Sequence, residues 1–152
     1  MKKTTNSLTN ILRHTRPSRI ENYLKQNAEE ILPNEKPFAQ YMRGLFREKN
    51  VLQQDVFLRA DISEGYGYKL IAEEKRTRRR DTILRLCLGA RFSLEETQRA
   101  LKIYGMSPLY ARFSRDAVLI SAISSGIYEI ADVNALLTKH GQAPLRTSAE
   151  NS

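Results

Sequence analysis

The strongest concentration of chemically capable side chains is a basic run at residues 75–80. It reads Lys75-Arg76-Thr77-Arg78-Arg79-Arg80, with five cationic residues in six. Lysine and arginine clusters neutralise phosphate groups and release the condensed counterions of a nucleic acid. Such contacts position a protein without reading sequence. The run therefore predicts attachment to a phosphate backbone, and a solvated charged loop is the alternative.

Residues able to catalyse a reaction or bind a metal are too scattered to form a site. His14 and His140 stand near opposite ends of the sequence, with no cysteine at ligand spacing. Gly65-Tyr66-Gly67 lacks the further glycine and the lysine of a nucleotide-binding loop. The acidic pairs are adjacent on expected helices and point in different directions: Glu29 with Glu30, and Glu95 with Glu96. We expect no enzyme, no metal and no cofactor.

The composition is that of a globular, basic chain. Hydrophobic residues make up 41% of the 152 residues, and 25 Lys+Arg against 17 Asp+Glu give a net charge of +8. This excess favours a polyanionic partner, nucleic acid before anionic membrane. No apolar run is long enough to span a membrane or to follow Met1 as a secretory signal. We expect a cytoplasmic protein whose single cysteine, Cys87, is a small buried core residue.

Apolar residues recur at helical spacing along almost the whole chain, whereas the period-two alternation of strands is absent. The pattern predicts an all-α protein. We expect a mobile basic arm over 1–17, a leading helix within 18–35, a helix-turn-helix domain over 36–105, a C-terminal helical annex over 106–145 and a disordered tail over 146–152. Expected helices after the first lie near 37–49, 53–60, 63–74, 79–88, 93–104, 114–123 (capped by Ser114) and 128–140.

Capping signals predict where several of these helices begin and end. Ser18 with Glu21, and Ser93 with Glu96, have the spacing of a capping box, in which both side chains bind free amides of the first turn. Pro37 fits the first turn of its helix. Glycine tolerates the left-handed conformation that follows a helix. The glycines expected in this role are Gly89, Gly105, Gly126 and Gly141.

Residues 53–71 have the pattern of two short helices joined by a tight turn. In a helix-turn-helix unit the first helix packs across the second, and the second keeps one face free for the major groove. A small residue at position 60 lets the two helices approach, and Ser63 is expected to cap the second one. The apolar residues expected to hold the unit together are Val56, Phe57, Ala60, Ile62, Leu70 and Ile71.

Phage-repressor-like (Cro-type, XRE) helix-turn-helix domains open with a pattern that this chain resembles at Gln53-Gln54-Asp55-Val56-Phe57-Leu58-Arg59-Ala60-Asp61-Ile62-Ser63. The resemblance covers residues 36–105. More narrowly, Tyr66-Gly67-Tyr68, Arg80-Asp81 and Leu94-Glu95-Glu96-Thr97-Gln98 are similar to a clostridial subgroup with a helical C-terminal extension. The resemblance implies a five-helix λ-repressor-like domain, with an N-terminal helix and a C-terminal helical hairpin. It also implies a bacterial, phage or mobile-element transcription regulator.

The resemblance also implies which side chains would touch DNA. The second helix of the unit would read base edges through Glu64, Tyr66 and Lys69. Gln53 would contact a phosphate at the start of the first helix, and the basic loop would face the duplex backbone. The implied DNA-binding residues are Gln53, Ser63, Glu64, Tyr66, Lys69, Lys75, Arg76, Arg78, Arg79 and Arg80.

The chain departs from the family pattern around the second helix. Asp61 and Glu73 stand where the family has glycine, and Arg78 stands where it has proline. Aspartate accepts the left-handed conformation better than most residues. Two glycines inside the helix cost about 1 kcal/mol each in helix propensity, and a leading glutamate is repelled by phosphates. We expect sequence reading by this helix to be weak.

Two further classes of function stay open beside binding of double-stranded DNA. A protein-binding adaptor, antitoxin or inhibitor that reuses the fold would explain the glycine-rich second helix and the apolar annex. Binding of nucleic acid or acidic surfaces through charge alone is a third hypothesis. Part of the annex is expected to pack on the first domain, and the rest to pack internally or to form a homodimer interface. Its apolar residues are Val118, Leu119, Ile120, Ile123, Ile127, Ile130, Val133, Leu136 and Leu137.

Overall fold

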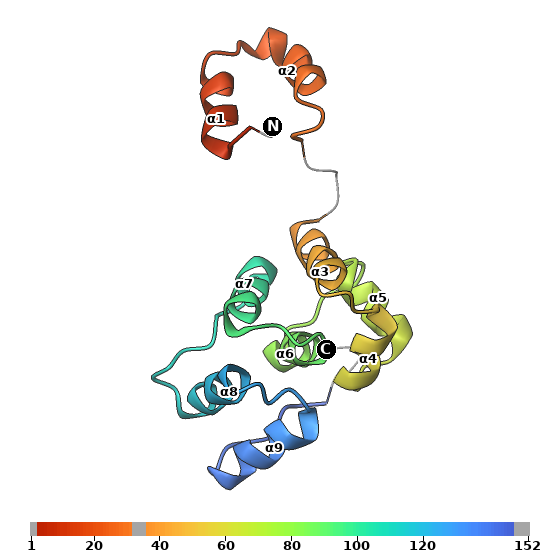
Figure 1. The fold of residues 1–152 in the computed structure, drawn as a ribbon, viewed down its shortest axis with the longest axis vertical. Helices are drawn as coiled ribbons and strands as arrows, with labels where there is room; N and C mark the ends of the chain where they lie inside the picture. The colour runs from red at the N-terminus through yellow and green to blue at the C-terminus, as the bar shows by residue number, and fades with distance from the viewer. Residues whose placement is uncertain (1–2, 32–35, 148–152) are drawn as a thin grey trace. The chain divides into compact units, whose positions relative to one another are not determined.

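The computed structural model describes residues 3–31 and 36–147, and every regular element within these ranges is a helix. This confirms the all-α class for the part of the chain that is described. The chain divides into two units, residues 1–35 and residues 36–152. We describe the two units separately. Figure 1 labels the helices.

The N-terminal unit contains a helix where a mobile arm was expected. Helix α1 spans Thr5–Arg13, and Thr4 caps it by accepting a hydrogen bond from the Ser7 amide at 3.0 Å. A short 3₁₀ helix, Pro17–Arg19, and helix α2, Ile20–Gln26, follow. The backbone amide of Lys3 donates to Glu30 at 3.2 Å, so the start and the end of the described part of this unit are joined.

Two further expectations for this unit were wrong. Ser18 lies inside the 3₁₀ helix, and Arg19 precedes α2 without a side-chain cap, so the capping box with Glu21 does not form. Helix α2 ends at Gln26 rather than near Pro33, and its apolar stripe faces solvent, with Ile20 41% and Leu24 48% exposed. A short stripe organises a helix only when a core lies against it. The expected end of the leading helix, at 32–35, lies outside the described residues.

The second unit consists of seven helices over the residues that the structure describes. They are α3 (Pro37–Glu48), α4 (Gln53–Ala60), α5 (Glu64–Ile71), α6 (Arg80–Gly89), α7 (Leu94–Tyr104), α8 (Ser114–Ser124) and α9 (Ile130–Lys139). Their bounds agree with the expected helices to within about three residues, because the signals that set them are local. The end of the expected C-terminal tail, residues 148–152, lies outside the described residues.

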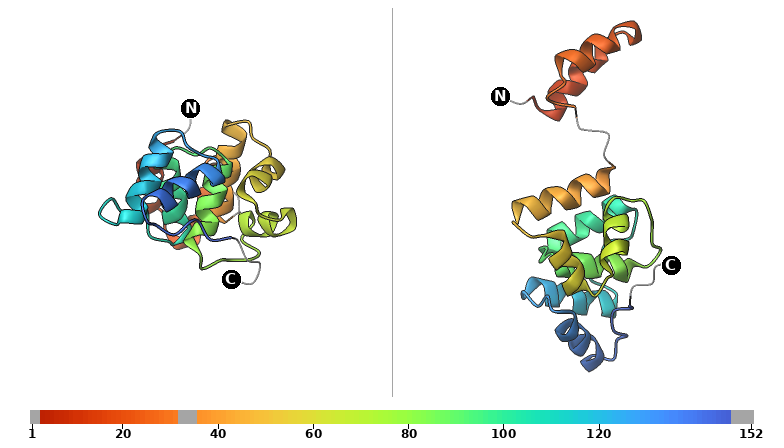
Figure 2. Two further views of the ribbon diagram at one scale, coloured as in Figure 1. Left: turned by 90° about the horizontal axis from the view of Figure 1, so that it is seen from below. Right: turned by 90° about the vertical axis from the view of Figure 1, so that its right-hand side faces the viewer.

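Helix α6 forms the centre of this unit. It lies between the α3–α7 side and the α8–α9 pair (Figures 1 and 2), and it packs directly against α4, α7 and α9. Every residue from Asp81 to Ala90 is buried, including Cys87 as expected. Burial raises the pKa of the Cys87 thiol to about 12, so it stays protonated. The annex joins this core through Leu119, Val133 and Leu137, which are fully buried.

Left-handed residues set the corners between helices. Asp61 ends α4 with φ 55° and ψ 50°, as expected for a residue in a glycine position. Glu73, in the second such position, has φ 57°. Gly105, Gly126 and Gly141 also have positive φ, as predicted. These conformations fix the direction of the chain at each corner.

Gly89 has a different role from the one predicted. It is the last residue of α6, and the left-handed residue that follows is Arg91, with φ 61°. A Cβ at Gly89 would lie 2.6 Å from the Val56 carbonyl oxygen and 3.3 Å from Ala60. Glycine is therefore required here for close approach of α4 to α6, not for a turn.

The last described residues run back over α6 and are held by arginine and aspartate. Arg85, only 3% exposed, donates to the carbonyls of Ala60, Leu145 and Arg146 at 3.1, 3.0 and 2.6 Å. Asp81 accepts two hydrogen bonds from Arg115, at 2.8 and 2.9 Å, and one from the Arg146 amide at 2.8 Å. Arg85 thus ties the end of α4 to residues 145–146.

Candidate nucleic-acid interface

Helices α4 and α5 are joined by a three-residue corner, residues 61–63, with an apolar side chain buried at its centre. After the left-handed Asp61, the Ile62 amide donates to the Phe57 carbonyl at 3.0 Å, and the Ile62 side chain is only 5% exposed. Ser63 is the N-cap residue of α5, but its side chain makes no capping hydrogen bond to that helix. Ser63 therefore occupies the N-cap position that was expected, but the expected hydrogen bond between its side chain and the helix does not form. The expected inner-face residues of α4, Val56, Phe57 and Ala60, are all buried.

Gly67 explains how α5 lies so close to α4. A Cβ at this position would stand 2.5 Å from the Phe57 ring, closer than a carbon can approach. The Phe57 ring also meets Tyr68 edge to face, with centroids 5.0 Å apart. The large Phe57 and the missing side chain at Gly67 are complementary, so this glycine serves packing. Gly65 has no atom within 4 Å of its Cβ position.

One face of α5 is buried and the other is open to solvent. Tyr66, Gly67, Leu70 and Ile71 are buried, whereas Glu64, Gly65, Tyr68 and Lys69 are exposed. Exposed residues at i, i+1, i+4 and i+5 form a single stripe on a helix. This stripe (residues 64, 65, 68 and 69) is the only surface of α5 that a large partner can touch.

Tyr66 has to be removed from the set of expected base readers. Its side chain is 3% exposed, and its hydroxyl is buried without a hydrogen-bond partner among the described residues. A tyrosine in the core cannot reach a base edge. Tyr68, which sequence reasoning missed, is 42% exposed on the open stripe. The signal was present, because Tyr66 lies four residues before the core residue Leu70, whereas Tyr68 lies four residues after Glu64.

Gln53 begins α4, as expected, and is only partly exposed. Its side-chain oxygen is buried and has no hydrogen-bond partner among the described residues. The nitrogen of the Gln53 amide group is a hydrogen-bond donor. A phosphate at the start of α4 is the kind of group that such a donor can bind.

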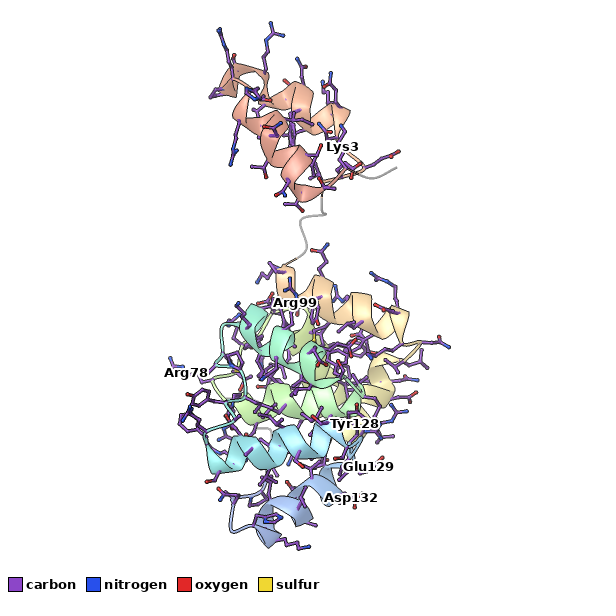
Figure 3. All side chains as sticks on the ribbon, turned by 60° about the vertical axis from the view of Figure 1, so that its left-hand side comes forward. Lys3, Arg78, Arg99, Tyr128, Glu129 and Asp132 are labelled. Atoms are coloured by element: carbon purple, nitrogen blue, oxygen red, sulfur yellow. The ribbon has the colours of Figure 1, made fainter. Side chains whose placement is uncertain are left out.

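The structure separates the basic run into free and engaged side chains. Lys75 and Arg78 are exposed, and neither side chain bonds to another described residue. Figure 3 shows Arg78 projecting outward from the body of the unit. Together with Lys69, which is also exposed, they supply three solvent-facing positive charges at and just after α5. We call Lys69, Lys75 and Arg78 the open cations.

Arg76 is engaged inside the unit. Its guanidinium carbon lies 4.2 Å from the centroid of the Tyr104 ring, and it donates to the Tyr104 carbonyl at 2.6 Å. It also pairs with Glu73 at 2.9 Å, which partly cancels its charge. The Thr77 amide donates to the Tyr104 hydroxyl at 2.9 Å. Arg76 therefore fixes the loop against α7.

Arg80 and Arg79 are engaged as well. Arg80 forms a two-pronged ion pair with Asp116, which is 2% exposed, and one of its contacts measures 3.1 Å. Arg79 donates to the Thr147 carbonyl at 3.0 Å. Because a carbonyl group is neutral, this hydrogen bond leaves the positive charge of Arg79 uncompensated. Of the five cations in the run, Arg76 and Arg80 act chiefly as structural residues.

The described residues hold no group of three side chains placed to bind a metal ion. His14 and His140 lie in different units. Within the described ranges, no helix combines the length and the apolar character that crossing a membrane requires. What the α4–α5 surface offers chemically is cations for phosphates and a short polar stripe with one carboxylate, one phenol and one ammonium.

Comparison of the chain with models of known protein families, with characterised proteins and with solved structures finds no match. The reasons for assigning a class to this protein are therefore the sequence pattern and the geometry described above.

Proposed function

We propose that the chain is a DNA-binding regulator in which α4 and α5 form a helix-turn-helix and the open stripe of α5 enters the major groove. The observation that carries the proposal is the division of α5. Glu64, Tyr68 and Lys69 face solvent, while the opposite face is buried against the core. Lys75 and Arg78 are exposed directly after this helix. A recognition helix needs this combination of anchored back and free front.

The arrangement of α3 to α7 supports a five-helix λ-repressor-like domain over residues 36–105. Helix α3 packs against α7 and α5, and α4 packs against α6. The left-handed Asp61 and Glu73 occupy the two positions where the resembled family has glycine. A residue other than glycine in the left-handed conformation costs about 1–2 kcal/mol. Because the chain bears this cost at both corners, we infer that the fold requires the backbone to turn in this direction there.

Affinity and specificity would come from different side chains in this mechanism. The open cations Lys75 and Arg78 neutralise phosphates, which adds salt-dependent affinity for any duplex. Lys69 can donate to guanine, and Glu64 can accept from the cytosine amino group. Glu64 also repels phosphates, so specificity rests on few contacts. Sites read in this way bind with modest preference over other DNA.

Equilibrium binding to a duplex from upstream of the protein's own gene, and to a scrambled duplex, tests the mechanism. We expect Lys69→Ala to weaken binding to the first duplex about five-fold or more. We expect Lys75→Ala with Arg78→Ala to weaken binding to both duplexes alike. Lys102→Ala, at an exposed lysine in the last turn of α7, is the matched control and should leave both unchanged. An equal effect of Lys102→Ala and Lys69→Ala would contradict the proposal.

A protein-binding adaptor, antitoxin or inhibitor is the second candidate, and one observation favours it. Leu58 on α4 is 80% exposed and Leu52 before α4 is 61% exposed. Both leucines forgo the free energy of burial, which a partner that covers them would supply. If these residues bind a partner, Leu58→Asp would abolish that binding and leave DNA affinity unchanged. Loss of DNA affinity with Lys69→Ala would favour the first candidate.

A homodimer through the annex remains part of the first proposal, because dimeric readers bind palindromic sites. Leu136, only partly buried, lines a shallow apolar hollow on α9 with Ile127 and Ala135. Leu136→Asp should therefore lower the dimer fraction in sedimentation equilibrium without unfolding the chain. Leu137 is fully buried and is unsuitable for this test.

A further inference from the structure

We propose that the turn at residues 110–113 is a second nucleic-acid contact that stacks on unpaired bases of a single strand. Tyr110 is 49% exposed and Phe113 is 62% exposed. Their rings meet edge to face with centroids 5.1 Å apart. The proposal concerns a different partner from the duplex assigned to α5, and it does not depend on duplex binding.

Hydrogen bonds fix the backbone of the turn that carries these two exposed rings. The Phe113 amide donates to the Tyr110 carbonyl at 3.0 Å, which closes a turn with the rings at its first and last residues. Next to it, Leu109 is buried and exchanges two hydrogen bonds with the Gln98 side chain, at 2.7 and 2.8 Å. The Tyr110 amide donates to Asp116 at 2.9 Å.

Holding two aromatic rings in water forgoes the favourable free energy that burial of their apolar surface would give. A fixed loop that does so presents a surface prepared for a ligand. The ligand has to offer flat faces, because the rings present faces and edges. Bases inside a duplex are stacked on one another and hide their faces, whereas unpaired bases expose them.

The charges around the rings complement a strand of phosphates. Arg112 stands between Tyr110 and Phe113 in the sequence of the turn and is exposed. The basic loop lies beside the turn, because Arg80 reaches from it to the Ser107 and Pro108 carbonyls, at 3.4 Å each, and to Asp116, which also binds the Tyr110 amide. Asp116 balances Arg80, so Arg112 is the uncompensated cation within the turn, and Arg78 and Arg79 add positive charge in the loop that Arg80 joins to it. Aromatic faces beside cations are the elements with which proteins bind single strands.

The chain contains no tryptophan, so Phe113→Trp introduces a single fluorescent reporter into the turn. We expect a twelve-residue thymidine oligonucleotide to quench this fluorescence to a saturable limit. A blunt duplex of the same sequence and heparin, a polyanion without bases, should leave it unchanged at the same salt concentration. Quenching by heparin would show a purely electrostatic contact, and equal quenching by the duplex would show insertion between paired bases. Either result would overturn the proposal, as would absence of quenching by the single strand.

Removing the two aromatic side chains gives an independent measure of how much stacking contributes to the affinity for a single strand. Tyr110→Ala with Phe113→Ala should weaken binding of the same oligonucleotide about tenfold or more, since each stacked base contributes roughly five- to a hundred-fold in affinity. Tyr110→Phe with Phe113→Tyr keeps both rings and should retain binding. Leu58→Ala, which removes an even more exposed apolar side chain on α4, is the control. If the double alanine variant instead changes only the oligomeric state, the turn is an interface between copies and the proposal is wrong.

Discussion

Gly65 and Gly67 lie two residues apart in α5, yet substitution by alanine should affect them in opposite directions. Gly65 has open space at its Cβ position, so Gly65→Ala should raise the free energy of unfolding by about 0.5–1 kcal/mol through helix propensity. Gly67→Ala would force a methyl group into the Phe57 ring and should lower it by about 1–3 kcal/mol. Urea unfolding followed by circular dichroism measures both. Effects of the same sign would show that Phe57 does not set the α4–α5 approach.

Asp81 makes the stability of the second unit depend on acid pH. Burial by itself raises the pKa of this carboxyl group, but hydrogen bonds and charge from Arg115 and the Arg146 amide outweigh burial and bring the pKa below its ordinary value. The ionised form therefore stabilises the fold above the pKa of the unfolded chain, about 4. That contribution is lost as the pH falls through the lower pKa of the folded state.

Urea unfolding between about pH 6 and pH 2.5 tests this dependence. The native chain should lose stability steeply below about pH 4, whereas Asp81→Asn should start less stable at neutral pH and lose less on acidification. Parallel curves for the two proteins would show that Asp81 does not carry the dependence. Glu96 also has a lowered pKa, because its bonds to Lys49 and Ser93 outweigh its burial, so a residual slope is expected in the variant.

Single residues of the candidate site were harder to predict than the bounds of its helices. The helical period places Tyr66 with the core residue Leu70, but sequence reasoning weighed it as an exposed reader. The roles of Arg76 and Arg80 were out of reach, because their partners, Tyr104 and Asp116, lie 28 and 36 residues away in sequence. A run of like charges shows where cations are concentrated and does not show which of them are paired.

Among the helices, α7 begins with a capping box whose contribution to stability can be measured. The Ser93 hydroxyl accepts a hydrogen bond from the Glu96 amide at 3.2 Å, and Glu96 accepts one from the Ser93 amide at 2.8 Å. Ser93→Ala should therefore lower the free energy of unfolding by about 1 kcal/mol. Ser114 was expected to cap α8 but lies within that helix, after Phe113. Ser114→Ala should change stability by no more than about 0.5 kcal/mol, and an equal loss in both variants would contradict the assignment.

Elements of the second unit could be predicted well because their signals are local. Pro37 starts α3, Ser93 caps α7 and Gly105 ends it, and each signal acts within one turn of its helix. The N-terminal unit was predicted poorly for a related reason. Its segments have similar local signals, but Ile20 and Leu24 meet no core, so Ser18 and the apolar stripe did not extend α2 as expected. Tertiary packing decides which local signals are used.

At the scale of the whole molecule, the large hydrophobic core lies in the second unit. Its members run from Phe38 to Leu145, and none of the described residues 3–31 is among them. A chain of residues 36–152 should therefore unfold cooperatively with a urea midpoint close to that of the full protein. Loss of cooperativity in this shorter chain would show that the N-terminal unit contributes to the core.

The measurement that tests the central claim most directly is selection of binding sites from a random duplex library by the full protein at two salt concentrations. If α5 reads DNA, the selection should enrich a sequence motif. The affinity of the protein for that motif should fall three- to four-fold or more per doubling of the salt concentration, as expected for a few phosphate contacts. The same selection with Lys69→Ala should lose or relax that motif. Absence of any motif, together with binding that does not respond to salt, would contradict a DNA-reading role for α5 and favour a protein partner.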